Sequence, residues 1–81
     1  MSERQMIQEI LNTVDVLYEF ENVDEDTKEY TILISQQKGD RRELEVINKE
    51  MNKYFTEADF DYQEELNPTD VEADIRVQIK R

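Results

Sequence analysis

The spacing of the apolar residues switches between two periods along this chain, and each period suits one kind of element. Spacings of three and four residues place side chains on one face of a helix, whereas strict alternation places them on one face of a strand. The helical spacing comes first, the alternating spacing follows, and the same succession recurs in the second half of the 81 residues. A chain patterned in this way is expected to fold as helices and strands that share one core.

The first helix is indicated by its start and by its apolar face. Ser2 and Gln5 fit an S-x-x-Q capping box, in which each side chain satisfies a backbone N–H at the beginning of a helix. Apolar residues follow at helical spacing from Met6 to Val14. We therefore expect a helix over residues 3–12.

Two alternating segments then predict a hairpin. Residues 14–21 alternate between apolar and polar side chains, and residues 30–35 do the same. Between them, residues 22–27 are polar and typical of a turn. Consecutive strands of this kind pair as an antiparallel hairpin.

The second helix can begin at either of two places. The single glycine breaks the pattern, and Asp40 with Glu43 forms another capping signal, which predicts a helix over residues 41–55. The alternative is a hairpin turn at the glycine, a third strand over residues 42–46, and a helix that begins only at Asn48.

The end of the chain predicts a second hairpin. Residues 58–63 alternate, residues 65–70 contain a proline and form a turn, and residues 71–79 alternate again. The two halves of the chain resemble each other weakly at an offset of 44 to 45 residues, as in the pairs Asp15 with Asp59 and Ile32 with Val77. Two amphipathic units could produce this similarity with or without a duplication.

The expected fold class follows from this order of elements. We expect a single α+β domain over residues 1–81, built as a two-layer sandwich with a mainly antiparallel four-stranded sheet and two helices on one face. The order is αββαββ, or αβββαβ if the alternative start of the second helix holds. The other face of the sheet is then open to solvent or to a partner.

The charge of the chain limits its partners. Ten Lys and Arg residues stand against 21 Asp and Glu residues, so the net charge is −11. Such a field repels nucleic acid and anionic membrane surfaces and attracts basic protein surfaces. We therefore expect a basic protein partner, with no direct nucleic-acid or membrane binding, although acidity can also serve solubility alone.

Several classes of chemistry lack their usual residues. There is no histidine and no cysteine, which removes the commonest general base, the commonest covalent nucleophile and thiolate metal sites. We expect neither an enzyme nor a cofactor or metal site. The lack of cysteine and of a signal-peptide pattern at Met1–Arg4 leads us to expect the cytoplasm, in a bacterial host cell.

The candidate binding surface is the open sheet face together with the two hairpin turns. Most carboxylates fall there, and alternate residues on one strand face lie about 6.6 Å apart, which resembles the spacing of successive phosphates along a nucleic acid. The pairs Asp59/Asp61 and Glu72/Asp74 are expected to form such rows. The candidate partner-binding residues are Asp15, Leu17, Glu19, Glu21, Asp24, Glu25, Asp26, Leu33, Asp59, Asp61, Glu64, Glu65, Glu72 and Asp74.

Two leucines stand out on this acidic face. If Tyr18 pairs with Ile32 in the first hairpin, Leu17 pairs with Leu33, and both point outward. Adjacent exposed leucines suggest a contact point for a partner. The alternative is a different register, or leucines that are exposed without a role.

In size, charge and lack of histidine and cysteine, the whole chain resembles the small acidic inhibitor proteins of bacteriophages and mobile elements, such as anti-restriction and anti-CRISPR proteins. This resemblance implies an inhibitor that occupies the basic cleft of a nucleic-acid-binding protein, such as a CRISPR or restriction effector, as a DNA mimic. The alternatives are an immunity protein or antitoxin against a basic toxin, and a homodimeric assembly subunit. The chain is expected as a monomer or a homodimer.

Overall fold

The computed structural model describes residues 2–81 and has the predicted order αββαββ of an α+β fold. The elements are α1 (Glu3–Val14), β1 (Leu17–Asp24), β2 (Glu29–Ser35), α2 (Leu44–Glu57), β3 (Asp61–Leu66) and β4 (Ile75–Lys80). The alternative with a third strand over residues 42–46 is wrong, because α2 already begins at Leu44 and residues 41–43 pair with no strand. The start expected at residue 41 is wrong by three residues, because Glu43 is the N-cap of α2 and Asp40 instead accepts a hydrogen bond from the Arg42 N–H in the preceding loop.

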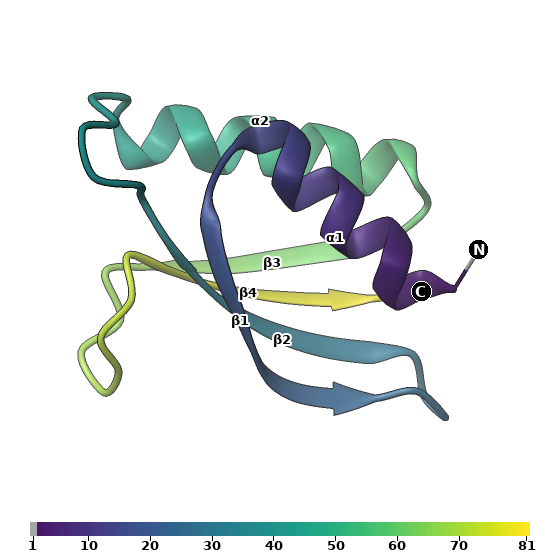
Figure 1. Cartoon of the computed structure of the whole chain (residues 1–81). Helices are drawn as coiled ribbons and strands as arrows, with labels where there is room; N and C mark the ends of the chain where they lie inside the picture. The colour runs from purple at the N-terminus through teal and green to yellow at the C-terminus, as the bar shows by residue number, and fades with distance from the viewer. Residues whose placement is uncertain (1) are drawn as a thin grey trace.

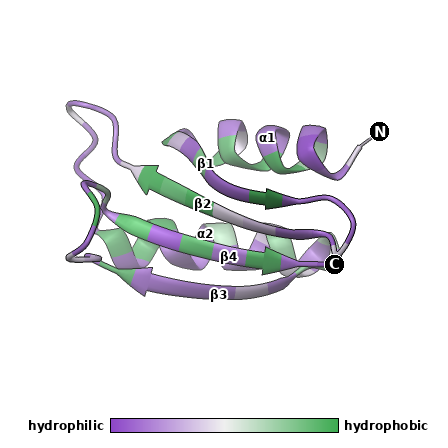
Figure 2. Ribbon diagram, turned by 90° about the horizontal axis from the view of Figure 1, so that it is seen from below, coloured by the Kyte–Doolittle hydropathy of each residue, from purple (hydrophilic) through white to green (hydrophobic). Residues whose placement is uncertain are grey.

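The four strands form one antiparallel sheet in the order β1-β2-β4-β3. Both helices lie on the same face of this sheet, and the other face is left open (Figure 1). Figure 2 views the sheet from that open side, with α2 behind β3 and β4. Between the layers lies one core, whose fully buried side chains include Ile7, Leu11, Ile32, Ile34, Ile47, Met51, Phe55, Ile75 and Val77.

The two helices end in the same way. Asp15 follows α1 with φ of 65°, and Asp59 follows the end of α2 with φ of 68°. After each aspartate comes a buried residue whose N–H donates to a carbonyl five residues back, from Val16 to Leu11 at 3.4 Å and from Phe60 to Phe55 at 2.9 Å. This left-handed ending directs each helix into the strand that follows it.

The strands of the two halves of the chain correspond in their pairing register. In the central pairing of β2 with β4, Ile32 lies opposite Val77, and the flanking pairs mirror each other across this point. The predicted similarity at an offset of 44 to 45 residues therefore has a counterpart in the strand register, with β2 in the position that corresponds to β4.

The first hairpin differs from the prediction in its register. Val14 belongs to α1, β1 begins at Leu17, and Tyr18 lies opposite Ile34, two residues beyond the expected Ile32. The strands extend further toward the turn than expected, and a bulge between Phe20 and Asn22 shifts their register by one residue.

The second hairpin is displaced along the chain. Its strands were expected over residues 58–63 and 71–79, but β3 covers Asp61–Leu66 and β4 covers Ile75–Lys80. Residues 67–74 form a loop that is closed by a hydrogen bond of 2.8 Å from the Asn67 N–H to the Asp74 carbonyl.

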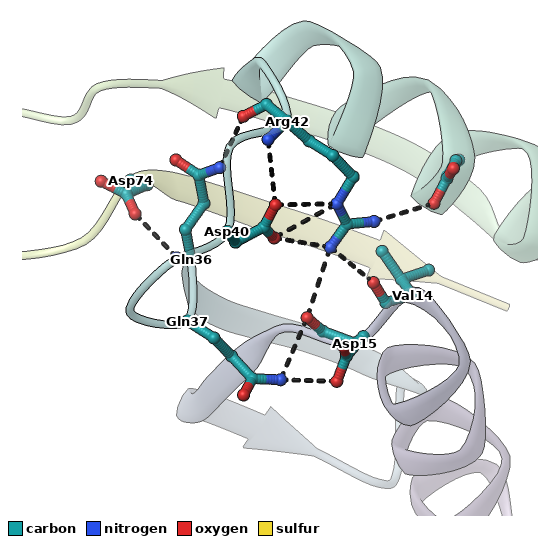
Figure 3. A network of polar contacts seen from close by, with 8 residues as sticks. Val14, Asp15, Gln36, Gln37, Asp40, Arg42 and Asp74 are labelled. Atoms are coloured by element: carbon teal, nitrogen blue, oxygen red, sulfur yellow. Dashed lines mark hydrogen bonds and ion pairs between the residues drawn. The ribbon is translucent and has the colours of Figure 1, made fainter.

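The loop between β2 and α2 is fastened to the end of α1 (Figure 3). Arg42 Nη2 donates to the carbonyls of Val14 at 2.9 Å and Asp15 at 3.3 Å, and to Asp40 Oδ2 at 2.7 Å. Its Nη1 reaches Glu50 of α2 at 3.2 Å. Because the last turn of α1 contains no basic residue, Arg42 supplies the positive charge that stabilises this helix end.

Candidate binding surface on the open sheet face

The open face of the sheet is organised in rows that run across all four strands. The pairing register sets three rows, which in the order β1, β2, β4, β3 are Glu19–Leu33–Arg76–Glu65, Asn22–Thr31–Gln78–Gln63 and Asp24–Glu29–Lys80–Asp61. The carboxylates stand mainly on the two edge strands, and both cations stand on β4. The face is therefore not uniformly acidic, because two acidic edges flank a mostly neutral or basic centre.

Arg76 is the centre of the first row and binds carboxylates from three segments. Its guanidinium lies 3.1 Å from Glu21 Oε1 on β1, 2.9 Å from Glu65 Oε1 on β3 and 2.8 Å from Asp70 Oδ2 in the β3–β4 loop. The hydrogen bond from Arg76 lowers the pKa of Asp70 below its ordinary value, and the carboxylates raise the pKa of Arg76. Only 16% of the Arg76 side chain is exposed, so this cluster holds both edges to the centre.

Apart from Glu29, which pairs with Lys80 at 3.2 Å, the carboxylates of this face outside the Arg76 cluster have no cationic partner among residues 2–81. Within residues 2–81, Glu19, Asp61 and Glu72 form no ion pair. The same holds for the acidic β1–β2 turn at residues 24–26, where Asp24 Oδ1 accepts hydrogen bonds from the N–H groups of Asp26 and Thr27. These groups are the part of the predicted surface whose charge no cation within residues 2–81 neutralises.

Leu17 and Leu33 share a hollow at one end of the face. They do not pair directly, because Leu17 lies opposite Ser35 and Glu19 lies opposite Leu33, but both line the same hollow with Glu72. Leu17 is 54% exposed. The expected register was wrong by two residues, and the expected proximity of the two leucines is retained.

Two of the predicted residues shape helix ends and do not belong to the open face. Asp15 and Asp59 occupy the left-handed positions after α1 and α2, so neither is part of a strand. The Asp15 carboxylate accepts a hydrogen bond from Gln37 Nε2. The expected Asp59/Asp61 row of alternating charges is therefore absent.

Two other predicted partner-binding residues, Glu64 and Asp74, accept hydrogen bonds from residues of the same fold. Glu64 lies on β3 but shares the register position of buried Val77, and it accepts a hydrogen bond from Asn48 of α2 at 3.1 Å. Asp74 precedes β4 and accepts a hydrogen bond of 2.8 Å from the Gln36 N–H. Glu72 and Asp74 are both loop residues, so the second expected row is also absent.

Sequence reasoning missed two features of this surface. It predicted a strand over residues 71–79 but not that Arg76, Gln78 and Lys80 lie on a central strand, and it assigned Asp70 only to a turn. The signal was present in the alternation of Arg76, Gln78 and Lys80, which puts two cations on one strand face. The sheet order that makes this strand central was not predicted.

The comparisons with known proteins give no relative. No family model matches the chain, and neither a curated protein nor a solved structure matches it. Among residues 2–81, no group of acidic side chains is arranged to hold a metal ion. Neither helix in this part of the chain has the length and apolar character needed to cross a membrane.

Proposed function

We propose that this chain is an acidic binding protein that inhibits a nucleic-acid-binding protein by occupying its basic cleft. The observation that carries the proposal is the layout of the open face, where two acidic edges flank a row of uncharged hydrogen-bonding side chains. A net charge of −11 favours a basic partner over any other. We place this activity in the cytoplasm of a bacterial host and assign no catalytic step to it.

The separation of the two acidic edges supports the comparison with a duplex. From β1 to β3 there are three interstrand spacings, which amounts to about 14 Å. The major groove of B-DNA is about 12 Å wide. A cleft that binds the two phosphate lines of such a groove would meet Glu19 and Asp24 on one edge and Asp61 on the other at a similar separation.

The centre of the face adds a second point of likeness. Asn22, Thr31, Gln78 and Gln63 form an uncharged row between the edges, and their side chains make no hydrogen bond with residues 2–81. Base edges in a groove offer hydrogen-bond donors and acceptors in the same intermediate position. Target side chains that normally hydrogen-bond to bases in a DNA groove would hydrogen-bond to the side chains of this row.

The experiment compares two charge-matched triple variants. The first carries Glu19→Lys, Asp61→Lys and Glu72→Lys on the open side, and the control carries Glu9→Lys, Glu45→Lys and Glu57→Lys on the exposed faces of the helices. Both have the same net charge, so a difference between them reports position and not total charge. Circular dichroism and thermal unfolding establish that each variant is folded.

Each protein is immobilised and exposed to bacterial lysate at low and high salt, and the bound proteins are identified by mass spectrometry. We expect the wild type and the control to retain a basic nucleic-acid-binding protein that duplex DNA displaces, and the open-side variant to retain none. Equal retention by both variants, or a partner indifferent to DNA and salt, contradicts the proposal. A cognate toxin as the partner would instead identify an immunity protein.

A further inference from the structure

We propose that the hollow formed by Leu17, Leu33 and Glu72, termed here the leucine hollow, anchors a partner segment that presents one large aliphatic side chain beside a basic one. This inference rests on the proposed function and names the feature of the basic partner that the site selects. Charge alone attracts many basic surfaces, whereas an apolar anchor distinguishes among them.

The apolar part of the hollow is open and unusual for this chain. Only three large hydrophobic side chains of residues 2–81 are exposed, and Leu17, at 54%, is the most exposed of them. Leu33 lies beside it on β2, diagonally across the β1–β2 pairing. Both leucines line the same hollow, where they supply an apolar contact among the polar residues Glu19, Ser35 and Glu72.

The charges around the hollow determine which kind of partner residue lies next to the bound aliphatic side chain. Glu19 borders Leu33 on the β1 side, Glu72 borders the hollow from the β3–β4 loop, and neither forms an ion pair within residues 2–81. On the opposite side of Leu33 lies Arg76, which already occupies the carboxylates of Glu21, Glu65 and Asp70, so the carboxylates without a cation lie at the hollow itself. A basic side chain of the partner is therefore directed toward Glu19 and Glu72, which gives the contact a fixed orientation.

The expected strength follows from the burial of one side chain. Covering an aliphatic side chain contributes about 1.5 kcal/mol or more, which corresponds to an affinity change of about tenfold. A contact of this kind loses less affinity in salt than the acidic edges do, because apolar burial is not screened. Removal of Leu17 should therefore change affinity at high salt as well as at low salt.

The test uses two synthetic peptides of equal charge, one with the central sequence Lys-Leu-Lys and one with Lys-Ser-Lys. Binding is followed by the methyl and amide chemical shifts of the isotopically labelled protein. We expect the leucine peptide to shift the methyl signals of Leu17 and Leu33 and to bind about tenfold more tightly than the serine peptide. Both peptides should also shift amides of the acidic edges at low salt.

Two threonine variants provide the control. Leu17→Thr should remove the advantage of the leucine peptide, whereas Val46→Thr on α2, where the side chain is 44% exposed, should leave it unchanged. If the two peptides bind with equal affinity and shift only amides of the acidic edges, the proposed role of the leucine hollow is overturned. The proposed function is then left intact. Absence of any shift at the edges at low salt overturns both.

Discussion

Asp15 and Asp59 hold the same position in the two halves of the chain, each as the left-handed residue that follows a helix. They differ in what their carboxylates contact. Asp15 accepts a hydrogen bond from Gln37 Nε2, whereas the Asp59 side chain makes no hydrogen bond with the described residues. Both residues therefore have the same unfavourable backbone conformation, but only the Asp15 carboxylate is stabilised by a hydrogen bond.

Replacement of Asp59 by glycine should stabilise the protein. A left-handed conformation is unfavourable for residues with a side chain, and glycine adopts it freely, so we expect Asp59→Gly to raise the free energy of unfolding by about 1 kcal/mol. Asp59→Asn removes the charge but keeps the side chain and should give a smaller gain. Asp15→Gly should gain less than Asp59→Gly, because it also loses the contact with Gln37. Urea unfolding measures all three, and a less stable Asp59→Gly variant would contradict this account.

Loss of Arg76 should destabilise the fold in a salt-dependent manner. Arg76→Gln leaves Glu21, Glu65 and Asp70 close together without a cation, so we expect a lower melting temperature at low salt. Added salt screens the repulsion and should narrow the difference from the wild type. Lys80→Gln removes the same charge from a single exposed pair and should have a smaller effect. Equal losses in the two variants would show that Arg76 has no special role.

The hydroxyl of Tyr62 contributes to the packing of α2 against β3. It donates to Asn48 Oδ1 at 2.6 Å, and burial raises the pKa of Tyr62 above its ordinary value. Tyr62→Phe should lower the free energy of unfolding by about 1 kcal/mol. Tyr54→Phe is the matched control, because the Tyr54 hydroxyl forms no hydrogen bond within residues 2–81. A neutral Tyr62→Phe variant in urea unfolding would show that the bond adds nothing.

Stability should fall in acid because three carboxyl groups are paired in the folded state. Hydrogen bonds from Arg42, Arg76 and Lys28 lower the pKa values of Asp40, Asp70 and Glu3, respectively. A lowered pKa in the folded state stabilises the fold above the ordinary carboxyl pKa of about 4. That contribution is lost as the pH falls through the lowered values.

The pH profile has a direct control. Urea unfolding between neutral and strongly acidic pH should show a loss of stability that begins near pH 4. In the Asp70→Asn variant this position cannot bind or release a proton, so the free energy of unfolding should fall less steeply with pH in this range. An unchanged slope in that variant would mean that Asp70 titrates alike in the folded and unfolded chains.

The sequence predicted the helices and the element order because these depend on local signals. The Ser2 half of the expected capping box forms, with a hydrogen bond of 3.1 Å from the Gln5 N–H to the Ser2 hydroxyl, whereas the Gln5 side chain forms no hydrogen bond within residues 2–81. The apolar faces of both helices are long enough to show the helical period clearly. The succession of periods, repeated twice, was therefore sufficient for the fold class.

Strand boundaries were predicted less well because tertiary contacts decide them. Residues 63–65 are polar throughout, yet they lie in β3, where an edge strand has only one neighbour and tolerates polar side chains on both faces. Val71 and Ala73 continue the alternation of β4, but Asp74 bonds the distant Gln36 N–H, and the chain before it forms a loop. Neither effect is visible in a periodic pattern.

The candidate site was predicted only in part for a related reason. The sequence shows where carboxylates occur, but their partners depend on which strands become neighbours. The order β1-β2-β4-β3 places Arg76 within reach of Glu21 and Glu65, which are 55 and 11 residues away in the chain. The sheet order therefore decides which acids are neutralised. Glu21 and Glu65 pair with Arg76, whereas Glu19 and Asp61 form no ion pair within residues 2–81.

The pairing of β2 with β4 has a consequence for how fast the chain folds. The two other strand pairings join neighbours in sequence, whereas Ile32 and Val77 are 45 residues apart. Nearly all the entropy of long-range loop closure therefore falls on one event, the docking of two locally formed halves. Substitutions at this central pair should slow folding, and substitutions in the hairpin turns should mainly accelerate unfolding.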